Sequence, residues 1–256
     1  MAGRQTADIV FCMDASSSMK PAFDGVRNHV MALSDALKGD ANTAWDVRYE
    51  FLAYSTRGKG TYCTLKTVRL DTKAVLDSIY RGGASMSSGA GIFTNDVEQF
   101  KAALSTVTCN GDEAPALALD IAADFPFRPA SSCHRVIVLM TDEAMEDGTN
   151  VPEARAKLEE LALKIQDRKI ALYLITPESN MYDTLSQIDR CEWTVVPDDG
   201  GKGLSGVNFD KLLGGIGKSV SVSSMQSIDK PIVPAPLFNE PNWSFPEDDV
   251  RAELEF

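Results

Sequence analysis

Short apolar runs alternate along this chain with segments of helical period, and this alternation limits the folds that are open to it. The first run covers residues 9–13, and two others lie within 134–141 and 169–176. Continuous apolar runs of this length are typical of parallel strands that are covered on both faces. Strands separated by helices form βαβ units, so the sequence predicts an α/β fold with a mostly parallel sheet and helices on both faces.

The same patterns predict where the individual elements lie. Residues 45–54 and 62–70 read as a hairpin at the edge of the sheet, because a glycine-containing turn separates two strand-like runs. A short last strand is expected at 192–196. Helical spacing of apolar residues predicts helices at 21–38, 72–80, 94–107, 116–125, 151–168, 182–188 and 207–220. The glycine- and serine-rich segment 81–93 reads either as a functional loop or as a surface turn.

Charge and cysteine content restrict the environment and the partners. The net charge of −12 argues against nucleic acid or an anionic membrane as the main partner. It favours a basic protein surface, or serves only to keep the protein soluble. The five cysteines are odd in number and widely spaced, which favours reduced thiols. Together with the lack of a secretory or membrane-spanning segment, this predicts a cytoplasmic protein.

A set of oxygen-bearing side chains follows the first apolar run. Asp14, Ser16 and Ser18 are each separated by one residue in the loop after the strand. One carboxylate and two hydroxyls form a hard-oxygen set that suits Mg²⁺ or Mn²⁺. The alternative is that Asp14 caps the next helix and the serines are turn residues.

A second aspartate, Asp142, follows the apolar strand at 134–141. Ligands of open α/β sheets bind outside the carboxyl ends of the strands, so Asp14 and Asp142 are expected to converge there. Two carboxylates that close require a cation, unless one of them takes up a proton.

These residues carry a resemblance to a known family. The run Asp14-Ala15-Ser16-Ser17-Ser18 matches a D-x-S-x-S signature, and with Asp142 the chain resembles the von Willebrand factor A domain family, which includes integrin I domains. The resemblance covers roughly residues 6–222. It implies a three-layer, doubly wound sheet of six strands in the order 3-2-1-4-5-6, with one antiparallel edge strand. It also implies a metal-ion-dependent adhesion site, in which Mg²⁺ or Mn²⁺ accepts an acidic residue of a protein partner.

The chain departs from the family pattern at one ligand. The family usually supplies a threonine before the helix that here starts near Pro115, and no threonine stands at the matching place. Asp112 or Glu113 is a candidate replacement, and Thr108 is another that stands early in the loop. The alternative is that the two acidic side chains only stabilise the following helix by lying near the positive end of its dipole.

The function expected from these observations is a metal-dependent protein–protein interaction module rather than an enzyme. The intracellular type that serves as an assembly or regulatory subunit fits best. A structural scaffold with a degenerate metal site is one alternative. A metal-dependent phosphatase or hydrolase is another, but Ser16 stands where a D-x-D motif needs a second acid. The chain has no G-x-S-x-G motif, and neither His29 nor His134 is placed to act as a base.

The last part of the chain has a different composition. Residues 226–256 hold five of the twelve prolines, with seven acidic and two basic side chains. The segment also carries aromatic residues, of which Trp243 and Phe245 are candidate partner-binding residues. We therefore expect a domain at 1–225 followed by an extended acidic tail at 226–256, which docks either on its own domain or on a partner.

Overall fold

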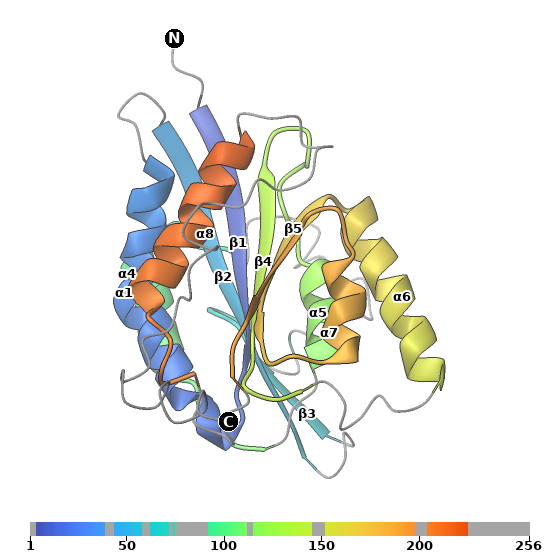
Figure 1. Cartoon of the computed structure of the whole chain (residues 1–256). Helices are drawn as coiled ribbons and strands as arrows, with labels where there is room; N and C mark the ends of the chain where they lie inside the picture. The colour runs from blue at the N-terminus through green and yellow to red at the C-terminus, as the bar shows by residue number, and fades with distance from the viewer. Residues whose placement is uncertain are drawn as a thin grey trace, which may run out of the picture.

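A six-stranded sheet runs through the centre of the molecule in the order β3-β2-β1-β4-β5-β6 (Figure 1). The computed structural model describes residues 4–38, 44–57, 62–71, 74, 92–111, 115–144, 152–197 and 204–224. All neighbouring strands pair in parallel except β2 and β3, which form the antiparallel edge. The strands are β1 (Arg4–Asp14), β2 (Ala44–Arg57), β3 (Tyr62–Lys66), β4 (His134–Met140), β5 (Ile170–Thr176) and β6 (Cys191–Val195).

Helices cover both faces of this sheet (Figure 1). One face carries α1 (Lys20–Lys38), α4 (Val97–Leu104) and α8 (Phe209–Ser224). The other face carries α5 (Pro115–Ala123), α6 (Pro152–Asp167) and α7 (Asn180–Ser186). Among the helices of the described ranges, none has the length and apolar character needed to cross a bilayer.

The side chains of β1 alternate between the two cores that these helices create. Ile9, Phe11 and Met13 enter the core beneath α1 and α8. Val10 and Cys12 enter the core beneath α5 and α6. All five are fully buried, which explains why the strand reads as a continuous apolar run rather than as an alternating one.

The predicted fold class, strand order and antiparallel edge are confirmed. The described elements begin and end within a few residues of the predicted ones, with three exceptions: β1 begins at Arg4 rather than near residue 9, β3 ends at Lys66 rather than at residue 70, and α4 is shorter than predicted. Of the helix predicted at 72–80, only Ala74 is described, and it is helical. Nearly all of segment 81–93 and the tail at 226–256 lie outside the described residues. The last two residues of segment 81–93, Ile92 and Phe93, are described and are buried core residues.

A charged cluster lies at the amino end of β1, away from the predicted site. Asp8 is fully buried and accepts bonds from Arg48 Nε at 2.8 Å, Arg48 Nη2 at 2.6 Å and Arg128 Nε at 2.9 Å. The Arg128 backbone N–H also donates to Asp8 Oδ2 at 2.7 Å. Arg48 lies over the ring of Phe93, 4.8 Å from its centroid. The cluster therefore connects β1, β2 and the segment that precedes β4.

Helices α1 and α8 approach each other closely at two glycines. A Cβ on Gly217 of α8 would lie 2.5 Å from the backbone oxygen of Leu33, and a Cβ on Gly25 of α1 would lie 2.3 Å from the ring of Phe209. Contacts this short do not occur between non-bonded atoms, so the two helices can pack at this distance only because glycine has no side chain at either position.

Candidate functional site

Asp14 ends β1 at the carboxyl edge of the sheet, the lower edge in Figure 1, and its carboxylate is fully buried. Its Oδ1 accepts the backbone N–H of Ser16 at 2.7 Å, and its Oδ2 accepts the hydroxyl of Thr141 at 3.0 Å. The bond to Ser16 spans two residues, as in an Asx turn, and so bends the chain directly after the strand. Asp14 thus shapes the loop and also connects it to the end of β4.

A chain of hydrogen bonds joins the remaining predicted side chains. The hydroxyl oxygens of Ser16 and Ser18 lie 3.2 Å apart, and the Ser18 hydroxyl donates to Asp142 Oδ1 at 3.1 Å. Asp142 is fully buried and Ser16 is nearly so. The structure therefore brings Asp14, Ser16, Ser18 and Asp142 together, although the two loops are more than 120 residues apart in sequence.

Backbone bonds hold the loop that carries the two serines. The N–H of Ala15 donates to the carbonyl of Tyr54 at 2.7 Å, which ties the loop to β2. The carbonyl of Ala15 accepts the N–H of Asn110 at 2.7 Å, which ties it to the loop before α5. Gly111 then takes a φ of 98°, a conformation that glycine adopts without strain. Three loops therefore meet at one point of the carboxyl edge.

Thr141 is a site residue that the sequence pattern did not single out. Besides its bond to Asp14, its hydroxyl accepts the N–H of Glu143 at 3.2 Å, and the Glu143 carbonyl accepts the hydroxyl of Tyr182 at 3.2 Å. Thr141 thereby orients both the carboxylate of Asp14 and the turn that contains Asp142. The sequence signal that could have identified Thr141 is its position directly before the strand-end aspartate Asp142. The apolar pattern alone assigns it to the end of the strand.

Four of the predicted site residues belong to segments outside the described ranges. Asp112 and Glu113, the candidates for a further ligand, lie outside the described residues, as do Trp243 and Phe245 of the tail. Within the described ranges, no three His, Cys, Asp or Glu side chains gather closely enough to hold a metal ion. The described part of the site contains the carboxylates of Asp14 and Asp142 and the hydroxyls of Ser16, Ser18 and Thr141.

The two thiols nearest to the site are protonated. Burial and the charge of Asp14 raise the pKa of Cys12 well above its usual value. Burial raises the pKa of Cys109, and the smaller opposing effect of Lys20 does not cancel this rise. Neither thiol is therefore available as a thiolate, and the side chains of the site offer oxygen atoms, which hard divalent cations prefer.

Neither histidine lies at this site. His134 begins β4, at the opposite edge of the sheet from Asp142. Its burial and, to a smaller degree, the charge of Arg190 lower its pKa to about 4. His29 lies within α1, with its Nδ1 3.6 Å from a carboxylate oxygen of Asp210. The arrangement therefore gathers oxygen atoms at one point, and neither histidine lies there to act as the base that activates a serine nucleophile.

Comparisons with known proteins point to one family. A model of the von Willebrand factor type A domain matches residues 8–198. A solved structure of a von Willebrand factor type A protein from Catenulispora acidiphila superimposes with a TM-score of 0.52 at 13% identity, covering 84% of this chain and 43% of that one. A structure of the pilus adhesin SpaC from Lactobacillus rhamnosus GG superimposes with a TM-score of 0.50 at 15% identity. The match covers 85% of this chain and 31% of that one. The chain spans less than half of both structures, and at these identities the likeness concerns the fold alone. No curated protein matches the chain.

Proposed function

The chain belongs to the von Willebrand factor type A domain family, and from this membership we propose that it is a protein-binding module with a metal-dependent site. The site at the carboxyl edge of the sheet holds Mg²⁺ or Mn²⁺. Through the cation it binds an acidic side chain of a protein partner. The module works without catalysis.

One observation carries this proposal: the oxygen atoms of Asp14, Ser16, Ser18 and Asp142 converge from two strand ends. Two buried carboxylates in one cluster repel each other unless a cation or a proton compensates their charge. Carboxylate and hydroxyl oxygens are ligands that Mg²⁺ and Mn²⁺ accept. The donor set therefore fits the cation that the family implies.

The residues divide into two roles in this proposal. Ser16 and Ser18 contact the cation directly, while Asp14 and Asp142 act directly or through water. Asp112 or Glu113 supplies a further carboxylate in place of the family's threonine, which lowers the net positive charge that a partner's carboxylate meets. The bound cation supplies a Lewis-acidic position for that carboxylate, and the protein residues hold and orient it.

The finer assignments are part of the same proposal. We assign the binding domain to residues 1–225 and a separate acidic tail to 226–256. Cys12, Cys109, Cys133 and Cys191 are free thiols, which supports a reducing, cytoplasmic environment. There the protein serves as an assembly or regulatory subunit.

Calorimetric titration of Mg²⁺ and Mn²⁺ into chelator-treated protein tests the proposal. We expect one site in the wild type and at least tenfold weaker binding in Asp142→Asn, which removes a charge with little change in shape. Asp35→Asn is the matched control, because the Asp35 side chain is 67% exposed on α1, outside the site. Its binding should equal that of the wild type.

A folded wild-type protein that binds neither cation would contradict the metal-dependent function and leave the scaffold alternative. Circular dichroism of each variant separates loss of binding from loss of fold. Binding by Asp142→Asn that equals that of the wild type and of Asp35→Asn would show that the cation binds elsewhere.

A further inference from the structure

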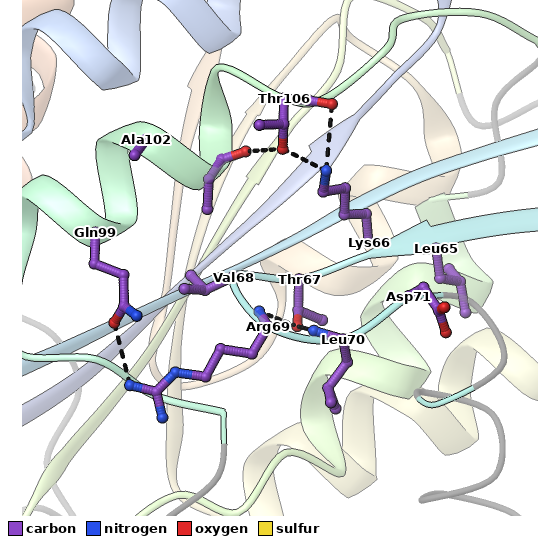
Figure 2. Close-up of a pocket in the computed structure, with 11 residues that line it drawn as sticks. Leu65, Lys66, Thr67, Val68, Arg69, Leu70, Asp71, Gln99, Ala102 and Thr106 are labelled. Carbon is purple, nitrogen blue, oxygen red and sulfur yellow. Dashed lines mark hydrogen bonds between the residues drawn. The ribbon is translucent and has the colours of Figure 1, made fainter.

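A groove of about 680 Å³ lies between the end of β3 and helix α4 (Figure 2). Its apolar lining consists of Leu65, Val68, Leu70, Ala102 and Ala103. Figure 2 shows Lys66 hydrogen-bonded to Thr106 and Arg69 hydrogen-bonded to Gln99. These two hydrogen bonds connect the strand side of the groove to the helix side. The groove thus combines an apolar lining with two cationic side chains.

The wall of the groove is held from inside the protein. Glu50 is fully buried, and its Oε1 accepts the N–H of Val68 at 2.7 Å and that of Phe51 at 2.8 Å. The hydroxyl of Thr67 accepts the N–H of Leu70 at 3.0 Å. On the helix side, Gln99 accepts the Thr94 hydroxyl at 2.7 Å and the Arg69 guanidinium at 3.1 Å. The groove is therefore preformed, which lowers the entropic cost of binding.

The charge of the groove contrasts with that of the whole chain. Lys66 and Arg69 contribute two positive charges to its lining, against the single carboxylate of Asp71. The whole chain carries a net charge of −12. Glu50, whose carboxyl lies behind the groove, is fully buried, and this burial raises its pKa well above the usual value. Such a surface favours an acidic segment that also carries apolar side chains.

The chain itself contains such a segment. In the tail, Trp243 and Phe245 are separated by one residue and are followed by Glu247, Asp248 and Asp249. Trp243 lies nineteen residues beyond Ser224, the last described residue. Nineteen extended residues span about 65 Å, whereas a compact domain of this size has a radius of gyration of about 17 Å. The segment can therefore reach the groove of its own domain.

We propose that the C-terminal tail, residues 226–256, docks into this groove of its own chain. Trp243 and Phe245 cover the apolar lining, and the acidic run at 247–249 faces Lys66 and Arg69. Because the tail is tethered, its effective concentration is in the millimolar range, so a weak contact suffices for occupancy.

Carbodiimide cross-linking of the full-length protein tests this, because the reagent joins carboxylates to lysine amines that lie in contact. Peptide mass spectrometry of the monomer should show Lys66 joined to Glu247, Asp248 or Asp249. The exposed lysines Lys157 and Lys211 should show no such links. Arg69→Ala should reduce the Lys66 link at least threefold, and Lys211→Ala is the matched control that should leave it unchanged.

Three results would overturn the proposal. The tail acids could link to Lys157 and Lys211 as often as to Lys66. The Lys66 link could occur only in a cross-linked dimer, which would assign the groove to the tail of a second copy. The link could disappear on addition of a chelator or in Asp142→Asn, which would place the tail at the metal site. A link that persists in Asp142→Asn supports docking whether or not the site binds a cation.

Discussion

At the scale of single residues, Asp8 shows how one buried charge depends on its partners. Burial by itself raises the pKa of a carboxyl, but the bonds and charges of Arg48 and Arg128 lower the pKa of Asp8 below its ordinary value of 3.8. An acid with a lowered pKa in the folded state stabilises the protein above the unfolded pKa. That contribution is lost as the pH falls through the folded value.

We therefore expect Asp8→Asn to lower the free energy of unfolding by about 3 kcal/mol at pH 7, because two arginines lose their shared carboxylate. The difference from the wild type should shrink below about pH 4, where Asp8 of the unfolded wild type takes up a proton. Urea denaturation at pH 7 and pH 3.5 measures both values. Asp35→Asn, in an exposed pair with Lys38, should change stability by no more than about 0.5 kcal/mol at either pH. An equal loss in both variants would contradict this account.

The site residues differ in how readily the sequence predicts them. Asp14 and Asp142 could be predicted because each follows an apolar strand, and the ends of parallel strands converge. Thr141 and Asn110 could not, because their contributions are a hydroxyl turned toward another loop and a backbone N–H that meets Ala15. Any non-proline residue carries such an N–H, so its use depends on loop conformation rather than on residue type.

At the scale of elements, periodicity predicted which segments form helices, and local bonds set where they begin. Residues 94–107 read as one helix, but the Asp96 side chain accepts the N–H groups of Glu98 and Gln99, so α4 begins at Val97. Thr94 pairs with Tyr49 of β2 in a backbone bridge instead. Similarly, β3 ends at Lys66 because Thr67 and Leu70 close a turn.

The packing of α8 on α1 gives a prediction with an internal control. Gly217→Ala would place a methyl group 2.5 Å from the Leu33 oxygen, so the helices must separate, and we expect a loss of about 1–3 kcal/mol. Gly214→Ala on the same helix meets no atom within 4 Å and should stabilise the protein by about 0.5–1 kcal/mol. Thermal and urea denaturation measure both values. Equal effects of the two substitutions would contradict the packing argument.

At the scale of the whole molecule, the alternation of strands and helices was enough to predict a parallel sheet with two covered faces. The strand order came from the family resemblance, and the structure confirms it. The loops to which we assign the cation ligands follow β1 and β4, the two central strands, and each of these strands contributes to both cores. Binding at this position therefore acts on the stability of the entire domain.

Metal binding should accordingly raise the melting temperature. A ligand at about 100 times its dissociation constant stabilises the folded state by about 2.7 kcal/mol, which for a domain of this size corresponds to a shift of roughly 5–10 °C. Differential scanning calorimetry with Mg²⁺ and after chelation measures this shift. Asp142→Asn, with at least tenfold weaker binding, should show no more than about half of this shift. A shift of equal size in that variant would assign the effect to ions bound elsewhere.

The backbone tethers of the serine loop, from Ala15 to Tyr54 and Asn110, bear on how such a protein changes over evolutionary time. Every non-proline residue carries these main-chain groups, so the two bonds themselves place no demand on residue type, whereas the burial of Ala15 and Tyr54 does. Selection then acts on a few oxygen-bearing residues and on the burial pattern of the strands. Lineages that share this scaffold can diverge until sequence identity falls to the 13–15% seen here, while their folds still superimpose.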